Sequence, residues 1–431
     1  MLAILGLVTI LLLLVLVISK KASPVVALIV VPVITALLGG FTTEIADFIT
    51  EGIKTISTTA VMFVFAILFF GVLMDAGTFN PIITRLLRIA GNDPVRIAIV
   101  TAILAMLVHL DGSGAVTFLI TVPAMVSVYD KLGMKRSTLA TIVALSAGTM
   151  NILPWGGPTI RAATALNVPV MELFLPMSIP LMAGLLTVLA IAYVMGLKER
   201  KNISWTHGML IEIPEKVKSV KLSLRESLVW YANILLIVVA ITVMIAAWLP
   251  PHVIFMLAFT AALCINYSNV NKQREKIEDH AKSALLMASI LFAAGCFIGI
   301  LQGSGMINAM ATAGLNYIPD VIGNNLALAT GLVSMPASLL FDPDSFYFGI
   351  LPVLATTAEH FNGSAIEVGR AAISGQMTTG FPISPLTGST FLLIGLADVD
   401  LGDHQRKTIP LAFLVTLVIL LVSVLVGAIN I

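Results

Sequence analysis

The sequence predicts an all-α integral membrane protein built from two inverted repeats. Of its 431 residues, 58% are apolar and 11% are charged, and the mean hydropathy is +1.03. Apolar runs long enough to cross a bilayer recur along the whole chain, as is typical of transmembrane helices. Short polar stretches interrupt four apolar segments, and these interruptions form two matching pairs, one in each half of the chain.

Ten apolar runs have the length of a transmembrane helix. They are 2–19, 24–41, 57–77, 137–166, 172–197, 228–249, 252–268, 281–303, 366–397 and 408–430. The runs 137–166 and 366–397 contain prolines and glycines near their centres, so each is expected to be a helix that is broken inside the membrane.

Two pairs of shorter runs, at about 95–130 and 323–360, are expected to form re-entrant hairpins. Each has a polar tip, Asp111-Gly112-Ser113 in the first hairpin and Asp342-Pro343-Asp344-Ser345 in the second. The backbone at such a tip must find its hydrogen bonds in protein or water, because lipid offers none. Each half then has five spans and one hairpin, and this odd number of crossings places the two halves in opposite orientations.

The predicted repeats are 1–197 and 228–431, and 198–227 is expected to be a cytoplasmic linker. With the N-terminus outside, 21 of the 24 Lys and Arg residues fall on the cytoplasmic side, in agreement with the positive-inside rule. We therefore expect a multi-pass protein of the inner (plasma) membrane with both termini outside. Segment 79–92 is expected to be an interfacial helix.

Three aspartates at the hairpin tips, Asp111, Asp342 and Asp344, are candidate metal ligands and substrate contacts. A carboxylate inside the membrane is costly and by default functional. Each could bind a divalent cation through oxygen or carry a coupling proton, and the alternative is that it only caps the second hairpin arm. The predicted site also includes the small residues beside them, Gly112, Ser113 and Ser345.

The helix ends at the two breaks supply free N–H groups for an anion and free carbonyls for a cation. Arg161 could hold a substrate carboxylate in a bidentate contact or pair with a tip aspartate. Trp155 could line the cavity or belong to an interfacial aromatic belt, and His109 is favoured as a hydrogen-bonded core residue over a proton relay. The predicted substrate residues at the breaks are Asn151, Trp155, Gly156, Gly157, Thr159, Arg161, Ser384, Thr387 and Ser389.

The charge balance of the predicted site limits the kind of substrate it can hold. The candidate region offers one clear arginine and three aspartates. A free polyanion would need several positive groups in a low-dielectric site. The residues therefore favour an anion that a divalent metal ion already largely neutralises. The basic–aromatic patches that would indicate nucleic-acid binding are absent from the sequence.

The chain resembles the citrate–metal–proton symporter family of bacteria. The resemblance covers essentially the whole chain and rests on three segments, HLDGSG at 109–114, NILPWGGPT at 151–159 and FPISPL at 381–386. It implies import of citrate complexed with Mg²⁺ or Ca²⁺ and coupled to protons, with the metal ion as part of the cargo and without an organic cofactor. It also implies the ion-transporter superfamily fold, shared with divalent anion/sodium symporters, which are typically homodimers with an elevator-like motion.

One departure concerns the coupling ion. The related sodium symporters carry Ser-Asn-Thr at the hairpin tips, whereas this sequence carries Asp111-Gly112-Ser113 and Asp342-Pro343-Asp344-Ser345. The difference favours coupling to a proton, or to the metal itself, over coupling to sodium.

An enzymatic function is not expected. Ser113 and Ser304 are flanked by glycines, but neither lies in a G-x-S-x-G motif, and H-E-x-x-H does not occur. Two other transport functions stay open, a carrier for another organic anion such as a dicarboxylate or gluconate, and a cation/proton antiporter. A passive channel is less favoured, since four convergent breaks suit an occluding site better than a pore.

Overall fold

The computed structural model describes residues 1–19, 21–202, 223–315 and 318–430, and this part of the chain is helical without β-strands. The first half contains α1 (Leu2–Ile18), α2 (Pro24–Leu38), α3 (Ile45–Asp75), α4 (Asn80–Ala90), α5 (Pro94–Val108), η1 (His109–Asp111), α6 (Gly114–Leu132), α7 (Arg136–Met150), α8 (Gly157–Leu166) and α9 (Val170–Asn202). The second half contains α10 (Leu224–Ile245), α11 (Pro251–Asn266), α12 (Val270–Gly303), α13 (Met306–Gly314), α14 (Asp320–Gly323), α15 (Leu326–Ala337), η3 (Ser345–Ile350), α16 (Leu351–His360), α17 (Ala365–Ile373), η4 (Phe381–Ile383), α18 (Gly388–Ala397) and α19 (Leu401–Leu425). The all-α prediction is confirmed, and most of the predicted linker, 203–222, lies outside the described residues.

Seven of the described helices are long and apolar enough to cross a membrane, which confirms the predicted integral membrane character. They are α3, α5 with η1, α6, α9, α10, α12 and α19. Both arms of the first hairpin belong to this group, so length and composition do not separate them from full spans. Their re-entry from one side of the membrane stays a prediction.

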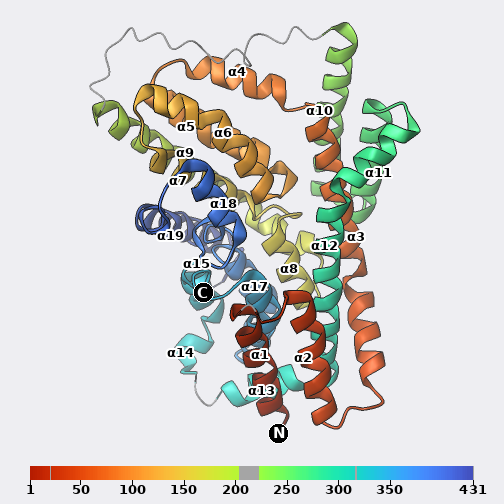
Figure 1. The fold of residues 1–431 in the computed structure, drawn as a ribbon. Coiled ribbons are helices and arrows are strands. Elements are labelled where there is room, and N and C mark those ends of the chain that lie inside the picture. Colours follow the sequence, from red (N-terminus) through yellow and green to blue (C-terminus); the bar gives the residue numbers. More distant parts are fainter. Residues whose placement is uncertain (20, 203–222, 316–317, 431) are drawn as a thin grey trace.

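Two long helices, α3 and α12, form the central pair of the molecule. A Cβ atom at Gly52 would lie 2.0 Å from the carbonyl oxygen of Gly295, and one at Gly299 would lie 2.2 Å from that of Phe48. Small residues thus let the two backbones touch, as is common between membrane helices. α3 leads to α4 at the top of Figure 1 and α12 leads to α13 at the bottom, so the pair runs antiparallel.

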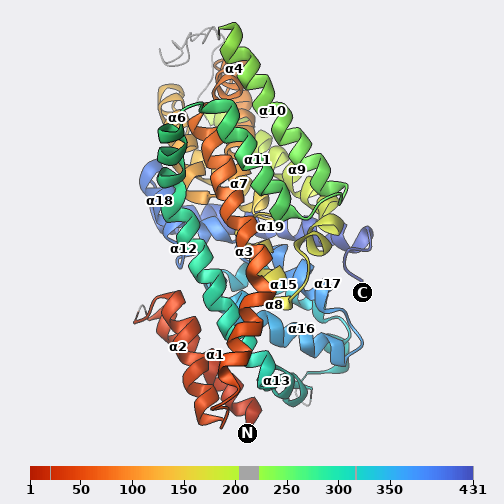
Figure 2. The same cartoon turned by 90° about the vertical axis from the view of Figure 1, so that its right-hand side faces the viewer.

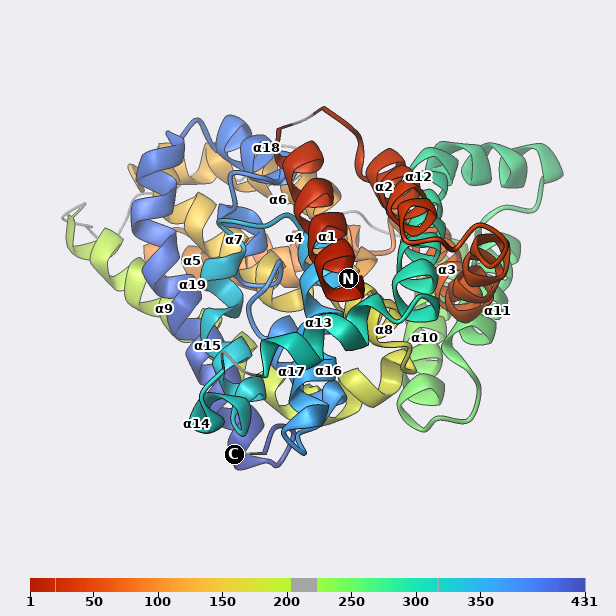
Figure 3. The same cartoon turned by 90° about the horizontal axis from the view of Figure 1, so that it is seen from below.

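Two groups of helices lie beside each other when the molecule is seen from below (Figure 3). The group on the right in that view contains α3, α10, α11 and α12, and the group on the left contains α5, α7, α9, α15 and α19. α2 lies against the lower half of α12, and α1 lies beside α2 and α13 (Figure 2). The hairpins and broken helices therefore gather beside the central pair rather than around it.

The order of the elements is the same in both halves. Each half has two helices, a long helix, a short helix, a hairpin, a broken helix and a final long helix, and the second half adds the four-residue α14 before its hairpin. This order and the antiparallel central pair support the inverted repeats. The repeat boundaries and the inverted relation themselves stay predictions.

The first break falls where the sequence predicts it, between α7 and α8, but the second break begins earlier than expected. α17 ends at Ile373, well before the polar stretch Gly380–Thr390 that the sequence indicates as the second break, and α18 begins at Gly388. The Ser338 hydroxyl accepts the backbone N–H of Met377 at 2.9 Å, and Met377 has a φ of +50°. A side chain of the neighbouring hairpin thus replaces the helical hydrogen bond and ends α17 early.

Candidate substrate site

The tip of the first hairpin is a tight turn between η1 and α6. Gly112 has a φ of +73°, a conformation that glycine adopts without steric cost. The Asp111 Oδ1 atom accepts the Ser113 N–H at 2.8 Å, and the Ser113 hydroxyl accepts the Val116 N–H at 3.3 Å. The Asp111 side chain therefore stabilises its own turn through Oδ1. Its Oδ2 atom accepts no hydrogen bond from the described residues.

Trp155 attaches this tip to the first broken helix. Its indole Nε1–H donates to the carbonyl oxygen of Leu110 at 2.7 Å, and its ring packs between Phe70 and Phe255 with centroid distances of 5.4 and 5.5 Å. The side chain is 3% exposed. Trp155 is thus a buried side chain that holds the hairpin tip in place. It neither lines the cavity nor belongs to an interfacial aromatic belt, the two positions that the sequence left open.

His109 and Asn151 connect the first hairpin to both broken helices. The His109 ring is fully buried, with Nδ1 2.8 Å from the Thr117 hydroxyl and Nε2 2.9 Å from Asn151 Oδ1. The Asn151 Nδ2 atom donates to the carbonyl oxygen of Met377 at 3.3 Å. His109 thus has the hydrogen-bonded core position favoured from the sequence. It does not line the substrate cavity, whereas its partner Asn151 does.

The second hairpin tip is turned into the protein. Asp342 Oδ1 accepts the backbone N–H groups of Asp344 and Ser345 at 3.0 and 3.1 Å, and its Oδ2 accepts the Ser345 hydroxyl. Asp344 Oδ1 accepts the Arg161 Nε–H at 2.7 Å, and both side chains of this ion pair are 8% exposed. Asp342 is thus a cap, and Asp344 is the partner of Arg161.

Hydroxyl groups of the second break hold the break itself together. The Ser384 hydroxyl donates to the carbonyl oxygen of Ser338 at 2.5 Å, and the Thr387 hydroxyl donates to that of Phe381 at 3.0 Å. The Thr390 hydroxyl reaches the same Phe381 oxygen at 3.2 Å. Pro385 cannot donate a hydrogen bond to the carbonyl of Phe381, and these threonine hydroxyls take its place, as a backbone that is shielded from water requires.

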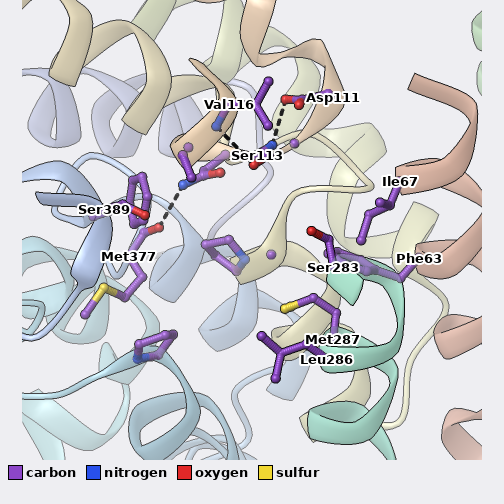
Figure 4. A pocket seen from close by; sticks show the side chains of 18 of the residues that line it. Phe63, Ile67, Asp111, Ser113, Val116, Ser283, Leu286, Met287, Met377 and Ser389 are labelled. Carbon is purple, nitrogen blue, oxygen red and sulfur yellow. Dashed lines mark hydrogen bonds between the residues drawn. The ribbon is translucent and has the colours of Figure 1, made fainter. Parts of the chain in front are cut away.

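A cavity of about 440 Å³ lies where the first hairpin tip, Pro343 of the second tip, both breaks, α3 and α12 meet. Figure 4 shows Asp111 and Ser113 of the first hairpin, Met377 and Ser389 of the second break, and Ser283 and Met287 of α12 around it. The structure brings eight of the predicted substrate residues to this cavity, Asp111, Gly112, Ser113, Asn151, Gly157, Arg161, Thr387 and Ser389.

A profile of the citrate transporter family matches residues 13–375 of the chain. The chain belongs to the citrate transporter family.

Two curated relatives from Bacillus subtilis (strain 168) match over the full length of both chains. One, named as a citrate transporter, is 42% identical over 433 residues. Another, named as a Mg²⁺/citrate complex secondary transporter, is 38% identical over 438 residues. The predicted family resemblance is confirmed, and so is the expectation of a transporter rather than an enzyme.

Two solved membrane transporters share the fold of this family member. The YdaH transporter of Alcanivorax borkumensis aligns with a TM-score of 0.63 at 15% identity, over 91% of this chain and 88% of its own. MtrF of Neisseria gonorrhoeae, described as one of a class of antimetabolite efflux pumps, aligns with a TM-score of 0.64 at 13% identity, over 90% and 86% of the two chains. These similarities concern the fold alone.

Seven of the predicted substrate residues of this citrate transporter family member do not line the cavity, although they lie near it. Trp155 and Asp344 hold elements that do line it, by the bonds to Leu110 and Arg161. The Thr159 hydroxyl donates to the carbonyl oxygen of Ile152 at 2.9 Å. The seven residues are Trp155, Gly156, Thr159, Asp342, Asp344, Ser345 and Ser384.

The sequence interpretation missed the contribution of α12 to the cavity. His280, Ser283 and Met287 line it, and their spacing places them on one face of that helix. His280 Nε2 lies 3.2 Å from Asp75 Oδ2, which also accepts Lys276 Nζ at 3.0 Å. The helical spacing of these three residues could have indicated that they share a helix face. The charged residues within 272–282 indicated a cytoplasmic loop instead.

The three predicted metal ligands do not converge. Among the described residues, no group of three or more His, Cys, Asp or Glu side chains is close enough to hold a metal ion. Asp342 is used by its own turn and Asp344 by Arg161, which leaves Asp111 as the tip aspartate at the cavity. A metal ion that arrives with its own carboxylate ligands needs fewer protein ligands than a resident one.

Proposed function

We propose that this family member imports citrate as a complex with a divalent cation, Mg²⁺ or Ca²⁺, in symport with protons and by alternating access. A relative that is 38% identical over its full length carries the name of a Mg²⁺/citrate complex transporter. The name of that protein supports the proposal, and the charges of the cavity in this chain give it a physical basis.

The observation that carries the proposal is that Asp111 and Arg161 line the same cavity. The Nε atom of Arg161 is held by Asp344, and its two Nη atoms make no hydrogen bond to the described residues. These Nη donors can hold a carboxylate in a bidentate contact. The Oδ2 atom of Asp111 lacks a protein donor and can meet a cation.

This pair of opposite charges suits metal–citrate better than free citrate. With its three carboxylates ionised, citrate would bring a large negative charge next to Asp111, and little positive charge would offset it. Complexed with a divalent cation, it keeps a single net negative charge and a positive centre. In this proposal Arg161 takes a carboxylate, and Asp111 faces the metal ion or carries the coupling proton.

The remaining features of the proposal concern the whole molecule. The two inverted repeats lie in the inner (plasma) membrane with both termini outside, and the protein works as a homodimer with an elevator-like motion. The cavity lies between the central pair, α3 and α12, and the hairpin tips and breaks. Movement of the hairpins and broken helices relative to the central pair would open and close it. A proton gradient supplies the driving force.

Citrate uptake into proteoliposomes tests the proposal, with each divalent ion added or chelated and a pH gradient imposed or collapsed. We expect uptake that needs both citrate and Mg²⁺ or Ca²⁺, and that an inward proton gradient accelerates. Uptake that chelation leaves unchanged would reject the complex as substrate. Uptake that depends on a sodium gradient and not on the proton gradient would reject the proton as the coupling ion.

A further inference from the structure

A second pocket, of about 630 Å³, lies between the C-terminal part of α9, the N-terminal part of α19 and the start of α7. Lys135, Lys198 and Lys407 contribute their side chains to it, together with the carboxylate of Glu199. Apolar side chains of α9 and α19, among them Val194 and Leu414, form its wall, and these two are 48% and 46% exposed. The pocket thus has a cationic end and an apolar side.

The three lysines of this pocket have no carboxylate partner within ion-pair distance among the described residues. Lys407 Nζ donates to the hydroxyls of Thr138 at 2.7 Å and Ser137 at 3.1 Å. Glu199, which is 4% exposed, already accepts the Thr138 hydroxyl at 2.6 Å and the Lys135 backbone N–H at 3.3 Å. Three ammonium groups therefore face one carboxylate, which two hydrogen bonds already hold in place.

Two neighbouring cations at this end of the described chain, Arg136 and Lys276, are paired with carboxylates. Arg136 contacts Asp130 at 2.8 Å and Asp398 at 3.0 Å. Lys276 contacts Asp75 at 3.0 Å and Asp279 at 2.7 Å. Glu199 attracts the ammonium group of Lys407, while the charges of Lys135 and Lys198 repel it. An anion bound between the lysines would relieve this repulsion.

We propose that this pocket binds the headgroup of an anionic phospholipid of the cytoplasmic leaflet, with an acyl chain along Val194 and Leu414. Basic pockets between transmembrane helices on the cytoplasmic side are known to hold such headgroups. A phosphate can accept hydrogen bonds from several lysines at once. The exposed apolar wall gives the lipid tail a surface that a free phosphate ion would not use.

Native mass spectrometry of the full chain released from bilayers tests the proposal. The probes are phosphatidylglycerol and phosphatidylcholine, offered together. We expect the protein to retain phosphatidylglycerol preferentially. Each lysine near the surface contributes about fivefold to the binding of an anionic lipid, so the double variant Lys135→Gln/Lys198→Gln should lower this preference by roughly 25-fold.

The matched control is Lys131→Gln/Lys201→Gln, which removes the same charge nearby but outside the pocket. An equal loss in the control, or no preference in the wild type, would overturn the proposal. Leu414→Gln leaves the lysines in place and should also weaken lipid retention. The pocket would be a site for a free anion instead if two results were found together. Leu414→Gln would leave lipid retention unchanged, and inorganic phosphate would displace the lipid.

A second copy of the chain is the remaining occupant to exclude. Val194→Cys in a Cys264→Ser background should not cross-link two copies in the bilayer, and efficient cross-linking would overturn the proposal. All of these measurements read lipid binding or contacts between copies rather than uptake. Their outcome is therefore independent of whether metal–citrate is the transported substrate.

Discussion

Arg161 and Asp344 form a buried ion pair that joins the second part of the first broken helix to the tip of the second hairpin. The Arg161 Nε and Asp344 Oδ1 atoms are 2.7 Å apart, although the residues are 183 positions apart in the chain. The pair fixes the guanidinium with its Nε edge toward the hairpin. Its remaining donors are thereby available to the cavity, so one arginine can serve both the fold and the substrate.

Replacement of Arg161 by lysine separates these two roles. Lysine keeps the positive charge beside Asp344 but presents a compact ammonium in place of the planar guanidinium. We expect folded protein whose affinity for Mg²⁺–citrate falls about tenfold or more, because a bidentate charged contact is lost. Titration calorimetry in the presence of Mg²⁺ measures this.

Arg370→Lys is the control for that experiment. Arg370 lies in α17 and donates to the carbonyl oxygens of Ala428 and Glu172 at 3.0 and 2.9 Å, away from the cavity. Its replacement should leave the affinity for Mg²⁺–citrate unchanged. An equal loss of affinity in both variants would mean that Arg161 acts only through stability.

Asp111→Asn tests the charge of the first hairpin tip. The asparagine oxygen can still accept the Ser113 N–H, so the turn should survive, while the negative charge is removed. We expect metal-dependent citrate uptake to fall at least about tenfold, because the contact to the metal ion or the proton-carrying group is lost. Asp130→Asn, at an exposed position of the same hairpin, should retain uptake. Full activity of Asp111→Asn would remove Asp111 from the mechanism.

Gly157 and Gly388 begin corresponding halves of the two broken helices but differ in their surroundings. A Cβ atom at Gly157 would lie 2.9 Å from Arg161 Nη1, whereas one at Gly388 would meet nothing within 4 Å. Gly157→Ala should therefore displace the guanidinium and weaken substrate binding, and Gly388→Ala should not. Binding isotherms of the two variants decide the point, and identical isotherms would contradict the assigned role of the Nη atoms.

Trp155→Phe removes one hydrogen bond and keeps most of the aromatic packing. The partly buried carbonyl of Leu110 would lose its donor, at a cost of about 1 kcal/mol in the free energy of unfolding. We expect a lower midpoint of thermal unfolding in detergent. Trp248 is 74% exposed, and Trp248→Phe should leave the midpoint nearly unchanged. If the two variants unfold alike, the bond between the indole and the tip contributes nothing measurable.

The sequence supports accurate placement of the helices because apolar length and its interruptions are local properties. The ten expected spans all correspond to helices or broken helices of the structure. The break at Asn151–Gly156 lies within the run 137–166, which was expected to be broken near its centre. The start of the second break was predicted too late, at Gly380. The acceptor that ends α17 early is the hydroxyl of Ser338, which lies on a different element, and the periodicity of the sequence does not reveal such a partner.

The sequence by itself determined that this chain is a helical membrane protein with four polar interruptions, since a bilayer excludes polar backbone wherever it occurs along the chain. The similar tips of the two hairpins, however, do not reveal which aspartate meets a ligand. Only the tertiary structure decided that Asp111 faces the cavity, that Asp342 and Asp344 are used internally, and that α12 supplies part of the wall. The reason is that each carboxylate takes the nearest strong donor, and that donor belongs to whichever distant segment packs against it.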